Sequence, residues 1–151
     1  MWPNVIEKGI TMTRAGVILK PGIHDLTLKE IEKIFCFNAH RKSLFKGLKK
    51  AVNNLKAAGV KEIYIDGSFV GDKELPSDID GCWMPTDGLK VDKIDPVLLD
   101  FSDSRKKMKK KFGVDFFLAN TIEGASGEPF LEFFQTDRDG KRKGIIKIKM
   151  E

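Results

Sequence analysis

The sequence has little cysteine and little histidine. Its only cysteines are Cys36 and Cys82, its only histidines are His24 and His40, and no Cys-x-x-Cys pair occurs. Two isolated cysteines exclude a disulfide scaffold and favour a reducing compartment, so a cytoplasmic location is expected. The four residues do not follow a standard zinc spacing, so buried thiols and ordinary surface or turn histidines are expected instead of metal ligands.

Long apolar runs are also missing, so no membrane span is expected. The first residues, Met1 to Asn4, show no basic region followed by an apolar stretch, and we expect no signal peptide. No nucleophile-elbow motif supports a serine hydrolase. What the 151 residues do contain is 41% hydrophobic side chains with 11 phenylalanines, enough for one domain with a real core.

Charge is distributed unevenly along the chain. Residues 1–60 carry 11 basic and 4 acidic side chains, residues 61–100 carry 4 basic and 10 acidic, and residues 101–151 carry 12 basic and 8 acidic. An acidic centre between two basic flanks can be an ordinary solvated surface. It is equally what a divalent-cation site would need, with basic flanks that attract phosphates.

Capping signals and periodicity predict two helices in the first half. Thr27 with Glu30 forms a capping-box pattern, so a helix should run from there to about Phe35. A second helix is predicted over residues 39–58, closed by Gly59, because leucine and valine recur at helical spacing. Residues 1–23 should be loop or edge strand, with a short strand at residues 16–19.

Strands are predicted at residues 61–66, 78–84 and 114–119. A helix should begin at Asp95-Pro96 and carry residues 105–111. Two further strands, 130–136 and 143–149, should form a hairpin around Asp139-Gly140. The expected fold is a single α/β (α+β) domain with a twisted mixed sheet and helices mainly on one face. Its core spans residues 27–119 and its C-terminal hairpin residues 130–150.

Three aspartates stand out on these predicted strands. Residues two apart on a strand point to the same face, so Asp78 and Asp80 should lie side by side. Two neighbouring carboxylates repel each other unless a cation such as Mg²⁺ or Mn²⁺ binds between them. Asp115 lies in an otherwise apolar strand, where a lone charge is costly unless it is paired or binds metal. These three residues are therefore the predicted metal ligands.

Gly67-Ser68 follows the first of these strands at its carboxyl end. Glycine permits close backbone approach, and serine offers a hydroxyl and an N–H to a phosphate. Gly67 and Ser68 are therefore candidate nucleotide-binding residues. Together with the carboxylates they supply the parts needed to move a nucleotidyl group.

Residues 60–119 resemble the DNA polymerase beta-like nucleotidyltransferase superfamily, through Gly67-Ser68, Ser77-Asp78-Ile79-Asp80 and Asp115. The resemblance implies that Gly67 and Ser68 hold the β- and γ-phosphates of an NTP. It also implies that the three aspartates are catalytic and bind Mg²⁺ or Mn²⁺. ATP is the expected donor of the nucleoside monophosphate.

A closer resemblance covers nearly the whole chain. The segments Pro21 to Asp25, Asp66 to Phe69, Lys73 to Pro76 and Phe134 to Gly144 are similar to an uncharacterised family of small bacterial and phage nucleotidyltransferase-like proteins. The sequence departs from the wider superfamily at Gly81-Cys82, where an aliphatic run is usual. Between Phe69 and Leu75 its only basic residue is Lys73, whereas minimal antitoxin-type enzymes often have several there.

The small size leaves little room for an acceptor domain. The acceptor should therefore be a macromolecule, either RNA such as tRNA or a partner protein, or a homodimer or partner should complete the site. A toxin–antitoxin or phage-defence setting fits such a minimal transferase. The alternative is a non-catalytic nucleotide- or RNA-binding module.

Each candidate residue also has an ordinary structural interpretation. Asp78 and Asp80 could be turn or capping residues, Asp115 could pair with a buried lysine or arginine, and Ser68 could cap a helix. Basic side chains could bind phosphates or simply face solvent. They are Arg41 and Lys42, residues 105–111, and Arg138 with residues 141–143.

Overall fold

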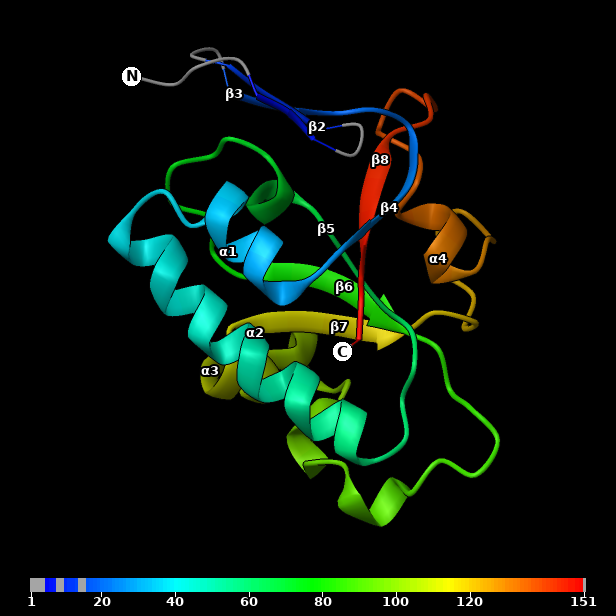
Figure 1. Cartoon of the computed structure of the whole chain (residues 1–151). Coiled ribbons are helices and arrows are strands. Elements are labelled where there is room, and N and C mark those ends of the chain that lie inside the picture. The colour runs from blue at the N-terminus through cyan, green and yellow to red at the C-terminus, as the bar shows by residue number, and fades with distance from the viewer. Residues whose placement is uncertain (1–4, 8–9, 14–15, 151) are drawn as a thin grey trace.

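The computed structural model describes residues 5–7, 10–13 and 16–150. A five-stranded mixed sheet with the order β4-β8-β5-β6-β7 lies at its centre (Figure 1). In chain order its strands are β4 (Gly22–Leu26), β5 (Ile63–Asp66), β6 (Ile79–Trp83), β7 (Val114–Leu118) and β8 (Gly144–Ile148). The pairs β4–β8 and β6–β7 are parallel, whereas β5 runs antiparallel to β6 and β8. The expected single α+β domain with a mixed sheet is confirmed.

A smaller antiparallel sheet precedes it. It consists of β1 (Val5–Glu7), β2 (Ile10–Thr13) and β3 (Gly16–Leu19). The strand expected at residues 16–19 is confirmed. Strand β4 begins inside the segment expected to be loop or edge strand and extends three residues beyond it. Residues 1–4, on which the signal-peptide expectation rests, lie outside the described part of the chain.

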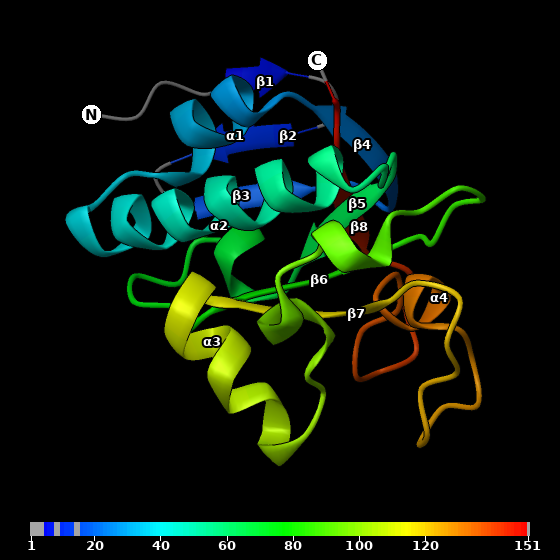
Figure 2. The same ribbon diagram turned by 90° about the horizontal axis from the view of Figure 1, so that it is seen from below.

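Three helices pack on one face of the large sheet, namely α1 (Leu28–Phe35), α2 (Ala39–Ala57) and α3 (Lys106–Phe112) (Figure 2). Thr27 and Glu30 form the predicted capping box at the start of α1. Asn38 caps α2, and Gly59, with φ +103°, follows that helix as expected. Among the described residues, no helix combines the length and the apolar character needed to cross a membrane.

Among the residues that the structure describes, the opposite face carries the short helix α4 (Phe130–Phe133) and its flanking loops, so the helices do lie mainly on one face. The prediction of a strand at residues 130–136 is wrong. The aromatic side chains there pack together under the sheet, where the Phe117 and Phe130 rings stack with centroids 4.2 Å apart. Helical spacing lets a cluster of phenylalanines reach one apolar patch, which an extended strand would split between two faces.

The predicted C-terminal hairpin is therefore only partly correct, because its turn around Asp139-Gly140 is present but its first arm is not a strand. The arms meet at an isolated bridge between Thr136 and Arg142, where the N–H of residue 137 donates to the carbonyl of residue 141 and the N–H of residue 143 to that of residue 135. The second arm is β8, which instead lies between β4 and β5. Because β8 lies next to β5, the segment just before β8 is at the same end of the strands as the end of β5 and the start of β6.

The helix predicted from Asp95 to residue 111 is broken into pieces. Three 3₁₀ segments precede α3: η2 (Val91–Lys93), η3 (Pro96–Leu99) and η4 (Asp103–Arg105). Residues 103, 104 and 105 have φ angles of 50°, 52° and 58°, which no right-handed helix can accommodate.

The loop after β5 is held by a buried arginine. Arg41 of α2 is fully buried, and its guanidinium donates to the backbone carbonyls of residues 35, 68, 69, 71 and 73. Its charge also lies 4.2 Å from the centre of the Phe37 ring. Arg41 is thus neither a solvated helix residue nor a free phosphate ligand. It fixes the segment that contains Gly67-Ser68.

We predict that Arg41→Met strongly destabilises the protein, because several buried carbonyl oxygens would lose their donors. The expected loss in free energy of unfolding is at least about 3 kcal/mol, measured by urea denaturation. Lys42→Met, at the exposed neighbouring position, is the matched control. This substitution should change the free energy of unfolding by less than about 0.5 kcal/mol. Equal effects of the two substitutions would contradict this role of Arg41.

Candidate active site

Three aspartates lie side by side across neighbouring strands of the large sheet. In the strand register, Asp66 of β5 pairs with Asp80 of β6, and Asp80 pairs with Asp115 of β7. Directly paired residues point to the same face of a sheet, so the three carboxylates share one face. The neighbouring Tyr64 and Cys82 also belong to the cluster under α4, so this face is the one opposite α1, α2 and α3.

Asp78, immediately before β6, lies close enough to this row for its charge to raise the pKa of Asp80. The structure therefore brings together the predicted residues Asp78, Asp80 and Asp115. Sequence reasoning missed Asp66 as a member of the site. The available signal was a charged residue at the end of a buried strand, directly before Gly67.

Crowding of negative charge changes the protonation of Asp80. Burial first, and then the charges of Asp78 and Asp115, raise the pKa of Asp80 to about 7. Burial also raises the pKa of Asp66, although the nearby Lys143 acts in the opposite direction. Asp66 and Asp80 therefore hold protons more tightly than ordinary aspartates, and a bound cation would relieve the repulsion at Asp80.

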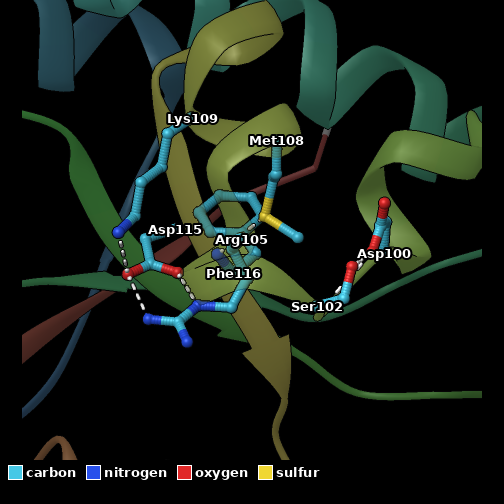
Figure 3. Close-up of polar contacts among 7 residues, drawn as sticks. All are labelled: Asp100, Ser102, Arg105, Met108, Lys109, Asp115 and Phe116. Carbon is cyan, nitrogen blue, oxygen red and sulfur yellow. Dashed lines mark hydrogen bonds and ion pairs between the residues drawn. The ribbon is translucent and has the colours of Figure 1, made fainter.

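Asp115 is neutralised by two cations from the same segment (Figure 3). Arg105 donates two hydrogen bonds to it, with Nε at 2.7 Å from Oδ1 and Nη2 at 3.2 Å from Oδ2. Lys109 Nζ lies 3.6 Å from Oδ2. The ordinary structural interpretation of Asp115, pairing with a basic residue, is therefore what the structure shows.

The break before α3 explains how Arg105 reaches this position. Its left-handed backbone turns the side chain back toward β7, where the guanidinium carbon lies 4.7 Å from the centre of the Phe117 ring. The hydrogen bond to Asp115 raises the pKa of Arg105, so the guanidinium stays charged. Left-handed residues cost about 1 kcal/mol each, and the ion pair with Asp115 offsets part of that cost.

A cavity of about 380 Å³ opens beside Asp66 and Asp80. Its other wall comes from the segment between α4 and β8, including Phe134, Arg138 and Lys143. Lys143 Nζ donates to Asp66 Oδ2 at 2.9 Å. The cavity thus has the carboxylates of Asp66 and Asp80 on one side, and Arg138 and Lys143 together with Asp137 on the other.

Gly67 is required by the shape of this site. Its φ is +81°, and a Cβ placed there would lie 2.2 Å from Asp80 Oδ2. Gly67 lines the cavity, and Ser68 begins the 3₁₀ segment η1 (Ser68–Val70). The N-cap of that segment is Gly67, so the interpretation of Ser68 as a helix cap is wrong.

The carboxylates are chemically suited to a magnesium site. Mg²⁺ prefers oxygen ligands and commonly uses one or two carboxylates together with substrate phosphates. Within the described residues, no group of three or more His, Cys, Asp or Glu side chains has the arrangement of a metal site. Asp66 and Asp115 instead contact Lys143 and Arg105. Asp78 and Asp80 form no ion pair with the described residues, so they are the carboxylates of the row that could hold a cation.

The cysteines and histidines have other roles. Burial raises the pKa of Cys36 to about 11 and that of Cys82 to about 12, so both thiols stay neutral and unreactive. His40 bonds the Pro76 carbonyl and His24 the Lys20 carbonyl. Both cysteines are buried and free.

A sequence profile of a family of unknown function, DUF6932, matches residues 11–149. This match covers most of the chain. The chain belongs to DUF6932. Comparisons of this DUF6932 member with curated proteins and with solved structures find no match.

We predict that Asp80 makes stability fall as pH rises. Between the ordinary aspartate pKa of 3.8 and the folded-state pKa of about 7, the folded protein binds a proton that the unfolded chain has released. Stability is therefore lost over that pH range. The loss is roughly 2 kcal/mol after allowance for partial solvent exposure.

The measurement is thermal unfolding from acid to neutral pH in the presence of a chelator. Asp80→Asn should flatten the pH dependence relative to wild type, whereas Asp87→Asn, at an exposed turn position, should not. If the stability of Asp80→Asn depends on pH as steeply as that of the wild type, the Asp80 carboxyl of the wild type has an ordinary pKa and the prediction is wrong.

Proposed function

We propose that this protein is a metal-dependent nucleotidyltransferase that moves a nucleoside monophosphate from an NTP to a hydroxyl group. ATP is the expected donor. The observation that carries the proposal is the register of the sheet, which aligns Asp66, Asp80 and Asp115 beside Gly67. Negative charge concentrated next to a cavity favours a reaction in which cations bring phosphates to carboxylates.

In the proposed reaction, the acceptor oxygen forms a bond to the α-phosphorus of the NTP. The bond from that phosphorus to the oxygen bridging to the β-phosphate breaks, and pyrophosphate leaves with the electron pair. Asp115 accepts the proton of the acceptor hydroxyl. Bound Mg²⁺ or Mn²⁺ supplies charge neutralisation for the triphosphate.

The remaining roles, holding the metal and binding the triphosphate, belong to side chains and backbone of this protein. Asp78 and Asp80 would hold the metal, and Asp115 would complete that site. The backbone at Gly67 and Ser68 would approach the β- and γ-phosphates, which a side chain at position 67 would prevent. Arg138 and Lys143, on the opposite wall of the cavity, would bind the triphosphate.

One observation favours the alternative of a non-catalytic binding module. Asp66 and Asp115 each contact basic side chains, as carboxylates do in a site that needs no metal. In such a module the cavity would hold a nucleotide through Arg138 and Lys143 without transfer. A product assay distinguishes the two functions.

We predict transfer of label from ATP labelled at the α-phosphate, and none from ATP labelled at the γ-phosphate, because pyrophosphate is released. The assay incubates the protein with Mg²⁺ and a tRNA mixture, and follows label in RNA and in protein after gel separation. Asp80→Asn should reduce the rate at least about a hundredfold, and Asp87→Asn should not.

Failure to transfer α-label from any of the four NTPs, to RNA or to protein, would favour the binding module. Label from the γ-position would indicate phosphoryl transfer instead. Equal rates in wild type and Asp80→Asn would show that another site catalyses the reaction.

A further inference from the structure

A groove separate from the cavity described above lies between α2 and α3. It has a volume of about 390 Å³ and is lined by Lys46 and Lys50 from α2 and by Lys109, Lys110 and Lys111 from α3. No aspartate or glutamate is among its lining residues. Lys46 and Lys50 are four residues apart, so they occupy the same face of α2.

Close contact between the two helices shapes the groove. A Cβ at Gly47 would lie 2.1 Å from the Phe112 carbonyl oxygen, so only glycine lets the end of α3 approach α2 this closely. Glycine is unfavourable inside a helix, so its position in the middle of α2 reflects this contact. The contact holds α2 and α3 next to each other (Figure 2). Lysines of both helices therefore line one groove.

Most of the positive charge in this groove is available to a ligand. Lys46, Lys50 and Lys110 are exposed and form no ion pair with the described residues. Lys111 pairs with Asp95 and Lys109 with Asp115. Uncompensated like charges gathered in a concave surface attract a partner with several negative charges.

One end of the groove reaches the candidate active site. Ser77 lines the groove and is followed in the chain by Asp78. Lys109 both lines the groove and lies 3.6 Å from Asp115 Oδ2 (Figure 3). A chain that followed the groove would therefore arrive at the carboxylates on β6 and β7.

We propose that this groove binds the sugar–phosphate backbone of a single-stranded polynucleotide and directs one of its hydroxyl groups to the site. The second part of this statement rests on the proposed function, whereas the binding does not. Nucleic-acid interfaces are strongly positive, whereas protein interfaces are depleted of lysine and centred on aromatic side chains. Phe112, the aromatic residue of the groove, is buried, which favours a polynucleotide over a protein partner.

The test is fluorescence anisotropy with labelled single-stranded RNA, and with DNA of the same sequence, in chelator and without NTP. Lys46→Gln, Lys50→Gln and Lys110→Gln are combined in one variant. Loss of up to three phosphate contacts should weaken RNA binding on the order of 10- to 100-fold. The slope of log K against log salt concentration should become less steep by about 2. A variant with Lys33→Gln, Lys61→Gln and Lys90→Gln removes the same charge from exposed positions outside the groove.

Weaker binding in the groove variant alone supports the proposal, and comparison of the RNA and DNA arms identifies the sugar that is preferred. Equal weakening in both variants, or no binding of either polynucleotide by the wild type, would overturn it. Binding of polyglutamate as tight as that of RNA would overturn it in favour of an acidic protein. Because NTP and metal are absent, this assay tests the groove alone. RNA binding here, combined with no transfer of α-label in the assay with Mg²⁺ and NTP, would refute the proposed function and leave the groove assignment intact.

Discussion

Repulsion among neighbouring carboxylates is the constraint on which the rest of this structure depends. Asp66, Asp80 and Asp115 lie side by side on three neighbouring strands, and the charge of Asp78 acts on the central one, Asp80. Buried negative charges in such proximity are tolerated only if protons or cations compensate them. The structure uses both, because Asp80 holds its proton to about pH 7 and basic side chains contact the two flanking carboxylates.

Several features that are unusual in themselves serve this compensation. The left-handed residues before α3 bring Arg105 onto Asp115. Insertion of β8 between β4 and β5 brings Lys143 onto Asp66. Arg41, buried behind the sheet edge, fixes the loop that begins at Gly67, where the absence of a side chain leaves room for the Asp80 carboxyl. The proposed metal would take over the role that protons and basic side chains have in this structure.

The sequence predicted the elements whose signals are local. The capping box at Thr27, the apolar stripe of α2 and the strands that carry Asp80 and Asp115 needed no knowledge of distant contacts. The prediction failed where distant partners decide the conformation. Strand β4 depends on pairing with β8, more than a hundred residues away in the chain, and α4 depends on burial of its phenylalanines against β7.

The candidate site follows the same division. Spacing alone indicated Asp78 and Asp80, and an isolated charge in an apolar strand indicated Asp115. Asp66 lies beside them because β5 pairs with β6 in antiparallel register, and Lys143 reaches the site because β8 pairs with β5. Local residue spacing reveals neither of these strand pairings. The structural role of Arg41 was equally hidden, because an arginine early in an amphipathic helix is normally exposed.

Direct detection of metal binding tests the central claim most sharply. Titration of the protein with Mn²⁺, followed by the electron paramagnetic resonance signal of the free ion, reports binding without any acceptor. The account predicts that wild type removes free Mn²⁺ from solution in the presence of ATP, and more strongly above the pKa of Asp80, because the ligand must lose its proton. Asp87→Asn should behave like wild type and Asp80→Asn should not bind. Unchanged free Mn²⁺ with wild type, or equal binding by Asp80→Asn, would contradict a metal site at these aspartates.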